Sequence, residues 1–244
     1  MKALLLPLAA ITAWEVGSRT GLLPVHWFPP PSTVAGTLFG LATRGELSGH
    51  VLATLERVLY GFLLGAAAGT ALGLLTGRSP LARALLDPTL QALRSIPSLA
   101  WIPLFLLWLG IAETSKVALI ALGAFFPVYL NLMLGIAAID RRLVEVGSLF
   151  GYTGFALARR ILLPATLPAY VAGLRSGLGL AWMFVVAAEL MGASRGLGYL
   201  MIDGQTTSRP ELVLGAIVLF AVLGKASDFG LERLGARLER WRTA

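Results

Sequence analysis

Few residues in this sequence are of types that act in catalysis. Their order along the chain does not match that of a serine hydrolase. Gly192-Ala193-Ser194-Arg195-Gly196 matches the G-x-S-x-G pattern of serine hydrolases, in which the partner histidine follows the serine. Both histidines, His26 and His50, lie upstream of Ser194. With 0 cysteines, the chain also lacks a thiol nucleophile and a thiolate metal site. We predict no catalytic residue and no metal site, and interpret these glycines as a tight turn.

A nucleotide site is not predicted either. The nearest approach to a phosphate-binding loop is Gly224-Lys225, which lacks the upstream glycine and the following serine or threonine of that motif. We therefore expect no cofactor bound by this chain. Any energy for its function must come from a partner.

The composition is that of a membrane protein. Hydrophobic residues make up 57% of the 244 residues and charged residues 14%, against about 25% charged in soluble domains, and the mean hydropathy is +0.78. The formal net charge of +7 would suggest nucleic acid in a soluble protein. In a membrane protein, the excess of basic residues belongs beside the spans, so we predict a lipid bilayer and no nucleic-acid partner.

Six windows predict membrane-spanning helices. They are Ala3–Val16, Val51–Thr76, Thr89–Ile111, Val117–Ala138, Ala169–Met191 and Leu212–Phe229. The first is short, but no good signal-peptide cleavage site follows it. The third contains Pro97 and Pro103 and is expected to become a span after Pro97. We predict an all-α polytopic fold that forms one transmembrane domain over residues 1–244, with its core at 51–229.

The basic residues predict the orientation of these spans. If the N-terminus is cytoplasmic, the inner segments hold Lys2, Arg78, Arg83, Arg94, Arg141, Arg142, Arg159, Arg160, Arg233, Arg237, Arg240 and Arg242. The outer segments hold Arg19, Arg44, Lys116, Arg195 and Arg209. This imbalance places both termini in the cytoplasm. The segment 140–168 is then a cytoplasmic loop of about 29 residues, far longer than the usual connection of roughly 4–6.

The pattern inside this loop predicts two short helices around a break. Asp140 is a plausible N-cap, Gly151 permits a turn, and Phe155–Leu163 is a second amphipathic stretch ended by Pro164. Pro168 is expected to start the next span. Taken alone, this pattern fits a hairpin lying on the membrane or a surface displayed to a cytoplasmic partner.

Glu145, Gly151, Ile161, Leu163 and Pro164 follow the order Glu-Ala-Ala-x-x-x-Gly and, further on, Ile-x-Leu-Pro. This pattern resembles the coupling loop of binding-protein-dependent ABC importer permeases. The chain departs from it where two alanines and a small residue are usual, at Val146, Gly147 and Tyr152. The resemblance implies that the coupling residues are Glu145, Gly147, Gly151, Tyr152, Ile161, Leu163 and Pro164.

Further segments resemble the subfamily that imports nitrate, taurine and alkanesulfonates. They are Pro29–Val34, Leu85–Pro88, Ile96–Ala100, Gly123–Pro127 and Ala187–Ser194. The resemblance implies the type I importer permease fold, a bacterial inner membrane and an extracytoplasmic binding protein. It also implies a cytoplasmic ATPase dimer that holds ATP and Mg²⁺. Because that dimer offers two docking clefts and this chain has one coupling loop, we expect a homodimer or a pair with a homologue.

A secondary transporter working without an ATPase stays open as an alternative. Such transporters commonly show internal repeats and half-helices around a charged midplane site. No convincing duplication is present in this sequence.

Three charged residues fall inside predicted spans, where burial is costly. Arg57 and Glu189 lie near the outer ends of their spans, and each suits either a gate or solute path, or simple solvation at the interface. Arg175 lies near the cytoplasmic side, which its long side chain is able to reach by snorkelling, and we do not assign it to the solute.

A glycine stripe marks the strongest span. Glycines recur every four residues at Gly61, Gly65, Gly69, Gly73 and Gly77, so one helix face is smooth enough for another backbone to approach closely. The sequence leaves open whether that neighbour belongs to the same chain or to a second copy.

Overall fold

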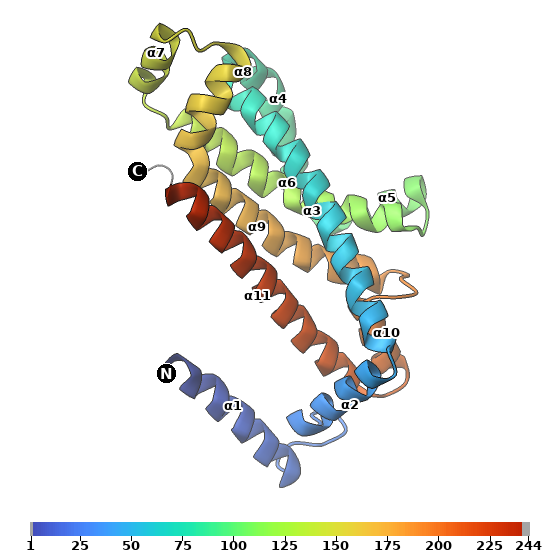
Figure 1. Ribbon diagram of the computed structural model, residues 1–244. Coiled ribbons are helices and arrows are strands. Elements are labelled where there is room, and N and C mark those ends of the chain that lie inside the picture. The colour runs from blue at the N-terminus through green and yellow to red at the C-terminus, as the bar shows by residue number, and fades with distance from the viewer. Residues whose placement is uncertain (1, 241–244) are drawn as a thin grey trace. The chain divides into compact units, whose positions relative to one another are not determined.

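The computed structural model describes residues 2–240, without the side chains of 2–4, 141, 158, 163, 239 and 240. Every regular element within these residues is a helix (Figure 1). The elements are α1 (Lys2–Arg19), α2 (Pro31–Thr43), α3 (Glu46–Arg78), α4 (Pro80–Ser95), η1 (Ser98–Trp101), α5 (Ile102–Leu109), α6 (Glu113–Ala137), α7 (Arg141–Leu149), α8 (Gly154–Leu157), η2 (Ala158–Leu162), α9 (Leu163–Leu190), α10 (Leu197–Thr206) and α11 (Pro210–Arg240).

Four helices are long and apolar enough to cross a membrane, namely α3, α6, α9 and α11. Each contains most or all of one predicted window and extends beyond it by a few residues or turns. The all-α polytopic prediction is confirmed.

The third predicted window is a bent pair and not a straight span. The chain turns by 91° between α4 and the segment formed by η1 and α5, because Pro97 has no amide hydrogen for a continuous helix. The 8 residues of α5 rise only about 12 Å. The expectation that a span begins after Pro97 is therefore wrong, and a fifth crossing exists only if the whole bent pair counts as one.

The first predicted window forms α1. The side chains at its start lie outside the described residues, as do those of Lys2, Arg141 and Arg240 and all of Arg242 from the predicted inner basic set. The number of about six spans is accordingly an approximation.

The chain forms two compact units. The first comprises residues 1–55 and 189–223, and its core brings together α10 and the adjoining parts of α3 and α11. Leu197, Leu200 and Ala216 are buried at its centre, and Val51 and Phe220 pack against them.

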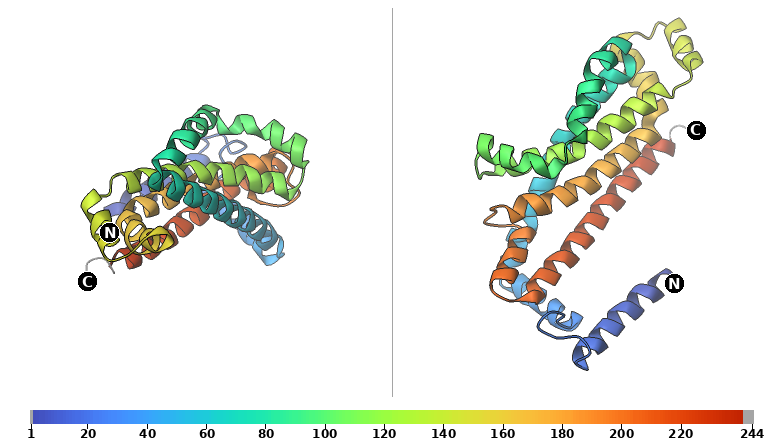
Figure 2. Two further views of the ribbon diagram at one scale, coloured as in Figure 1. Left: turned by 90° about the horizontal axis from the view of Figure 1, so that it is seen from above. Right: turned by 180° about the vertical axis from the view of Figure 1, so that it is seen from behind.

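The second unit comprises residues 56–188 and those from 224 onward. Its core follows α6, where Ile120, Ala124, Val128 and Tyr129 are all 0% exposed. In Figures 1 and 2, α6 runs beside α9, and α5 projects sideways from it.

Candidate functional site

The predicted coupling loop has the expected local structure in its first half. The side chain of Asp140 caps α7 by accepting a hydrogen bond from the backbone N–H of Arg142 at 2.9 Å. Gly151 adopts a φ of +77°, which favours glycine, and the chain turns there toward α8. The predicted cap and turn are confirmed.

The second half of the loop differs from the prediction. The π-helical η2 continues directly into α9, which contains both Pro164 and Pro168. Pro164 therefore does not end a helix, and Pro168 does not start one. Pro164 is the second residue of α9, where a proline is tolerated, and Pro168 lies inside α9, where a membrane-spanning helix accommodates a proline with the help of its neighbours.

Gly147 holds the two arms of the loop together. It is buried, and a Cβ at this position would lie 3.0 Å from Cγ1 of Ile161 and 3.1 Å from Cδ1 of Leu157. Its carbonyl accepts a hydrogen bond from the backbone N–H of Tyr152 at 3.1 Å. Glycine in place of the usual alanine thus allows α7 to pack closely on η2.

The outer surface of the loop is apolar and is not covered by the described residues of its own unit. Leu149 is 86% exposed, Phe150 75% and Phe155 79%, and Glu145 and Pro164 are also exposed. The side chain of Leu163 lies outside the described residues. In Figure 1, α7 stands apart from the long helices of its unit.

Two contacts fix the loop from inside the same unit. The guanidinium of Arg160 donates to the hydroxyl of Tyr152 at 3.0 Å and lies 4.9 Å from the centre of its ring. Arg78, at the end of α3, donates to the carbonyl of Gly154 at 2.9 Å. The loop is thereby tied to a membrane helix.

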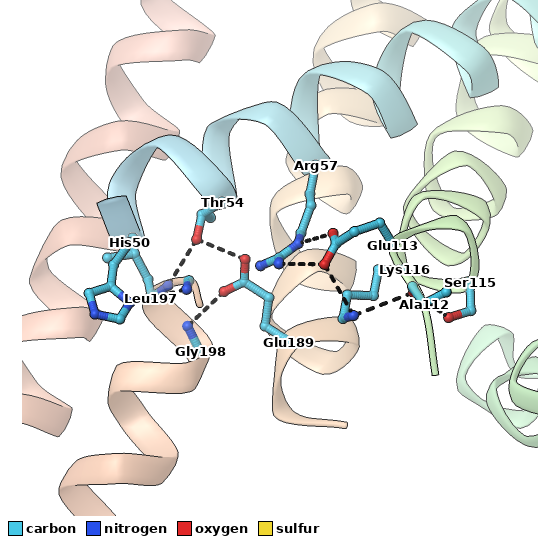
Figure 3. A network of polar contacts seen from close by, with 11 residues as sticks. His50, Thr54, Arg57, Ala112, Glu113, Ser115, Lys116, Glu189, Leu197 and Gly198 are labelled. Carbon is cyan, nitrogen blue, oxygen red and sulfur yellow. Dashed lines mark hydrogen bonds and ion pairs between the residues drawn. The ribbon is translucent and has the colours of Figure 1, made fainter. Parts of the chain in front are cut away.

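Glu189 is the centre of a buried cluster in the first unit (Figure 3). It is 0% exposed, as is Thr54. One carboxylate oxygen accepts from the hydroxyl of Thr54 at 2.8 Å, and the other accepts from the backbone N–H of Gly198 at 2.7 Å. Thr54 in turn accepts from the N–H of Leu197 at 2.9 Å. The carboxylate therefore joins α3 and the start of α10 to the end of α9.

Two glycines make room for this carboxylate. A Cβ at Gly196 would lie 2.5 Å from the carboxyl carbon of Glu189, and one at Gly198 would lie 2.7 Å from its Cβ. Gly196 also has a φ of +131°, and its N–H donates to Nδ1 of His50 at 3.2 Å. These residues, His50, Thr54, Glu189, Gly196, Leu197 and Gly198, are called the Glu189 cluster below.

Arg57 belongs to an ion-pair group in the second unit, also drawn in Figure 3. It is 5% exposed. Its Nε and Nη2 donate to the two carboxylate oxygens of Glu113 at 2.6 and 2.8 Å. Lys116, 6% exposed, lies 3.3 Å from the same carboxylate. Such a two-point pairing holds a guanidinium in a fixed orientation.

The burial of Glu189 and Arg57 contradicts simple solvation at the interface. Sequence reasoning found these two residues and missed Thr54, Glu113 and Lys116. A signal existed for Glu113 and Lys116, since these oppositely charged residues are three apart and lie just before a predicted span. None existed for Thr54, which lies 135 residues from Glu189.

Arg175 is paired with acidic residues of its own unit. Its guanidinium donates to both carboxylate oxygens of Asp228 at 2.8 and 3.0 Å and to Glu232 at 3.0 Å. Both partners lie on α11. The charge is matched by a neighbouring helix and need not reach the headgroup region.

The glycine stripe lies against α6 of the same chain. A Cβ at Gly69 would lie 2.7 Å from the carbonyl oxygen of Phe125, and one at Gly73 would lie 3.0 Å from that of Tyr129. Gly61, Gly65 and Gly77 face α6 at similarly close range. This face is therefore occupied within the second unit.

Comparison with known proteins assigns the family. Residues 65–240 match the family described as the binding-protein-dependent transport system inner membrane component. The chain belongs to this permease family. A putative aliphatic sulfonates transport permease, SsuC of Bacillus subtilis (strain 168), is 43% identical to this permease and aligns over 100% of it and 88% of the relative.

Two relatives from Escherichia coli (strain K12) are also similar to this permease. Its putative aliphatic sulfonates transport permease SsuC is 38% identical, with 98% of this chain and 91% of the relative covered. The taurine transport system permease TauC is 32% identical, with 95% and 86% covered.

A solved structure gives the same fold. The MetNI methionine ABC transporter, in an inward-facing conformation, contains a chain that matches this permease with a TM-score of 0.68 and 22% identity. The match covers 79% of this permease and 95% of that chain. The type I importer permease fold inferred from the sequence is confirmed. The chain is a transport subunit and not itself an enzyme.

Proposed function

We propose that this permease imports a small solute carrying an oxyanion group, such as an alkanesulfonate, taurine or nitrate. The support is the set of relatives named for aliphatic sulfonates and taurine, together with the nitrate import permease NrtB of Leptolyngbya laminosa, which is 32% identical over 185 residues. Sulfonate and nitrate share compact, delocalised oxygens that guanidinium groups match. Which of them is the physiological solute is a property of the separate binding protein.

The single observation that carries the coupling mechanism is the exposed apolar surface of the loop. Leu149, Phe150 and Phe155 turn outward from a short, capped helix pair, and large exposed apolar groups of this kind mark contact sites. A cytoplasmic ATPase dimer holding ATP and Mg²⁺ docks on this surface. Glu145, Gly151 and Tyr152 shape the loop, together with Ile161, Leu163 and Pro164.

Motion of the ATPases reaches the membrane helices through covalent and polar links. The loop continues without interruption into α9, and the contact of Arg78 with Gly154 joins it to the end of α3. A short rigid element of this kind carries motion between two states of the transporter.

The Glu189 cluster and the Arg57 group act at the opposite ends of the same helices, where solute enters. An extracytoplasmic binding protein delivers the solute there. The Glu189 cluster fixes helix ends through a buried, hydrogen-bonded carboxylate, and the Arg57 group does so through a buried arginine paired with Glu113. Helix ends fixed in this way suit a gate whose parts move as rigid bodies.

The assembly is a homodimer in a bacterial inner membrane, with both termini in the cytoplasm. Two copies are required because each copy offers one docking loop. Residues 1–244 form a single permease domain, in which 51–229 is the core and 140–168 the coupling loop.

The test is reconstitution of the permease with its ATPase and its binding protein in liposomes. We expect the ATPase to co-purify with the permease, and uptake of a sulfonate or nitrate to require both ATP and the binding protein. Uptake by the permease alone would instead favour a secondary transporter.

A further inference from the structure

The bent pair of α4 and α5 breaks the helical backbone inside the membrane. The 16 residues of α4 rise about 24 Å, less than the roughly 30 Å of a hydrocarbon core. The hydroxyl of Tyr129 donates to Asp87 at 2.8 Å, which fixes α4 beside α6. Tyr129 lies about two turns from the C-terminal end of α6, and Ser95 lies about two turns beyond Asp87. The break after Ser95 therefore lies at hydrocarbon depth, and so does Arg94 next to it, which corrects the sequence-based placement of Arg94 in a cytoplasmic segment.

Irregular backbone at this depth needs water or protein beside it. Lipid cannot hydrogen-bond to free N–H and C=O groups, so non-helical segments occur there only in protein or along a water-filled cavity. Within this chain, Ser95, Ile96 and Pro97 are all exposed, and Ile96 is 40% exposed. Among the described residues, the other helices of the second unit do not cover the break.

The polar residues of α4 share one face, which leads to this break. Arg83, Asp87, Gln91 and Arg94 are spaced by four, four and three residues, so they lie on one side of the helix. The opposite side is apolar and exposed, with Leu81 at 70% and Leu85 at 67%. We call the first side the polar face of α4.

Hydrogen bonds join the members of the polar face in sequence. Asp87 accepts from Tyr129 and from the amide of Gln91 at 3.2 Å. Gln91 accepts in turn from Nη1 of Arg94 at 3.2 Å. The carboxylate of Asp87 thus lies at the end of this chain of bonds that contacts Tyr129. The exposed guanidinium of Arg94 lies at the other end, next to the break.

We propose that the polar face of α4 and the break at 95–97 line the aqueous passage for solute, and that Arg94 binds the oxyanion of the solute in transit. The class of solute assigned to Arg94 rests on the proposed function. The inference that residues 95–97 line an aqueous passage is independent of which solute is carried.

The chemistry of the guanidinium suits this task. One of its five donors is used by Gln91, so an oxyanion can approach the others in a paired geometry. Asp87 repels an anion, but Arg83 and Arg94 outnumber it on this face. A single exposed arginine also binds weakly enough to release the solute, as a conducting path requires.

Thiol labelling tests the passage, because the chain has 0 cysteines and single substitutions are unambiguous. Ser95→Cys, Ile96→Cys and the control Leu85→Cys would be treated, in the full complex with its ATPase, with a charged, water-soluble thiol reagent. Thiolates react in water, so we expect the first two to react at least about tenfold faster than Leu85→Cys. Equally slow reaction at all three positions would overturn the proposal.

Transport by Arg94 variants tests the anion site. In the reconstituted complex, Arg94→Gln is expected to lower sulfonate and nitrate uptake at least about tenfold, and Arg94→Lys to lower it less, because only the charge is kept. The control is Arg44→Gln, an exposed arginine paired with Glu46, which should transport normally. The two solutes are measured separately to distinguish a sulfonate path from a nitrate path.

Stimulation of ATP hydrolysis by the loaded binding protein distinguishes failure of the anion site at Arg94 from failure of the proposed import function. We expect this stimulation to persist in Arg94→Gln while uptake falls. Normal uptake by Arg94→Gln would refute the anion site. If the unaltered permease showed no stimulation and no uptake of either solute, the proposed function would fail, whereas the labelling result at Ser95 would still stand.

Discussion

The coupling loop and the Glu189 cluster handle polar and apolar groups in opposite ways. The loop exposes Leu149 and Phe150 and is fixed by a few contacts at its edges. The Glu189 cluster buries a carboxylate and satisfies it with a hydroxyl and a backbone N–H. An exposed apolar surface is suited to a partner, and a buried satisfied carboxylate is suited to holding the chain's own segments in one arrangement.

Both regions also depend on a glycine with a positive φ, for different reasons. Nothing lies within 4 Å of a Cβ at Gly151, whereas a Cβ at Gly196 would meet the carboxylate of Glu189. Gly151 supplies only backbone freedom, and Gly196 supplies both freedom and space. Substitutions in the two regions should therefore differ in what they damage.

The largest effect is expected from Glu189→Leu. It removes the acceptor of two buried donors, Thr54 and the N–H of Gly198, at about 1–3 kcal/mol each. The midpoint of thermal unfolding in detergent should fall sharply. Glu145→Leu, an exposed loop residue, is the control and should leave the midpoint unchanged. Equal midpoints for the two variants would contradict the role of the Glu189 cluster in stability.

The next largest effect is expected in the difference in thermal stability between Gly196→Ala and Gly151→Ala. Each places a side chain at positive φ, which costs about 1–3 kcal/mol, but only Gly196→Ala also collides with Glu189. Thermal unfolding should show a clearly greater loss of stability for Gly196→Ala. If Gly151→Ala proved the more damaging of the two, the assigned reasons for these glycines would be wrong.

Gly151→Pro should affect coupling more than stability. Proline cannot adopt the φ of +77° and removes the bond from the N–H of Gly151 to Ser148, so the loop changes shape. We expect uptake to fall about tenfold, as for a lost interaction of about 1.4 kcal/mol, with membrane insertion and basal ATP hydrolysis retained. Uptake equal to that of the unaltered permease would remove the loop from the coupling mechanism.

The smallest effect is expected from Tyr152→Phe. It removes the bond from Arg160 and keeps the ring beneath the guanidinium. Because the bond is exposed, its loss should cost less than about 1 kcal/mol, and Tyr152→Ala should cost somewhat more because it loses the ring as well. Uptake and thermal unfolding of the two variants measure the difference. A severe defect in Tyr152→Phe would show that the hydroxyl, and not the ring, shapes the loop.

Local features of the fold were predictable from the sequence. The long spans follow from continuous apolar windows, and the N-cap at Asp140 and the turn at Gly151 follow from residue type and position. The position of the break at Pro97 was predictable, but the 91° bend that follows it was not. A proline interrupts a helix without determining the direction of the chain after it. Pro164 and Pro168 led to a wrong boundary because a proline is tolerated in the first turn of a helix, as at Pro164, and inside a membrane-spanning helix, as at Pro168.

Partners distant along the chain were not predictable. Arg175 and Asp228 lie 53 residues apart, and their pairing depends on how α9 and α11 pack. The same applies to Glu189 and Thr54. Sequence reasoning identified the charged residues as important because burial of charge is costly, but only the fold shows which groups compensate for it.

The most direct test of the account asks which side of the membrane the coupling loop faces. Leu149→Cys would introduce the only thiol of the chain at a position that is 86% exposed. A membrane-impermeant thiol reagent should label it in inside-out vesicles stripped of the ATPase, should not label it in intact spheroplasts, and should be blocked when the ATPase is restored. Labelling from the outer face would contradict the account.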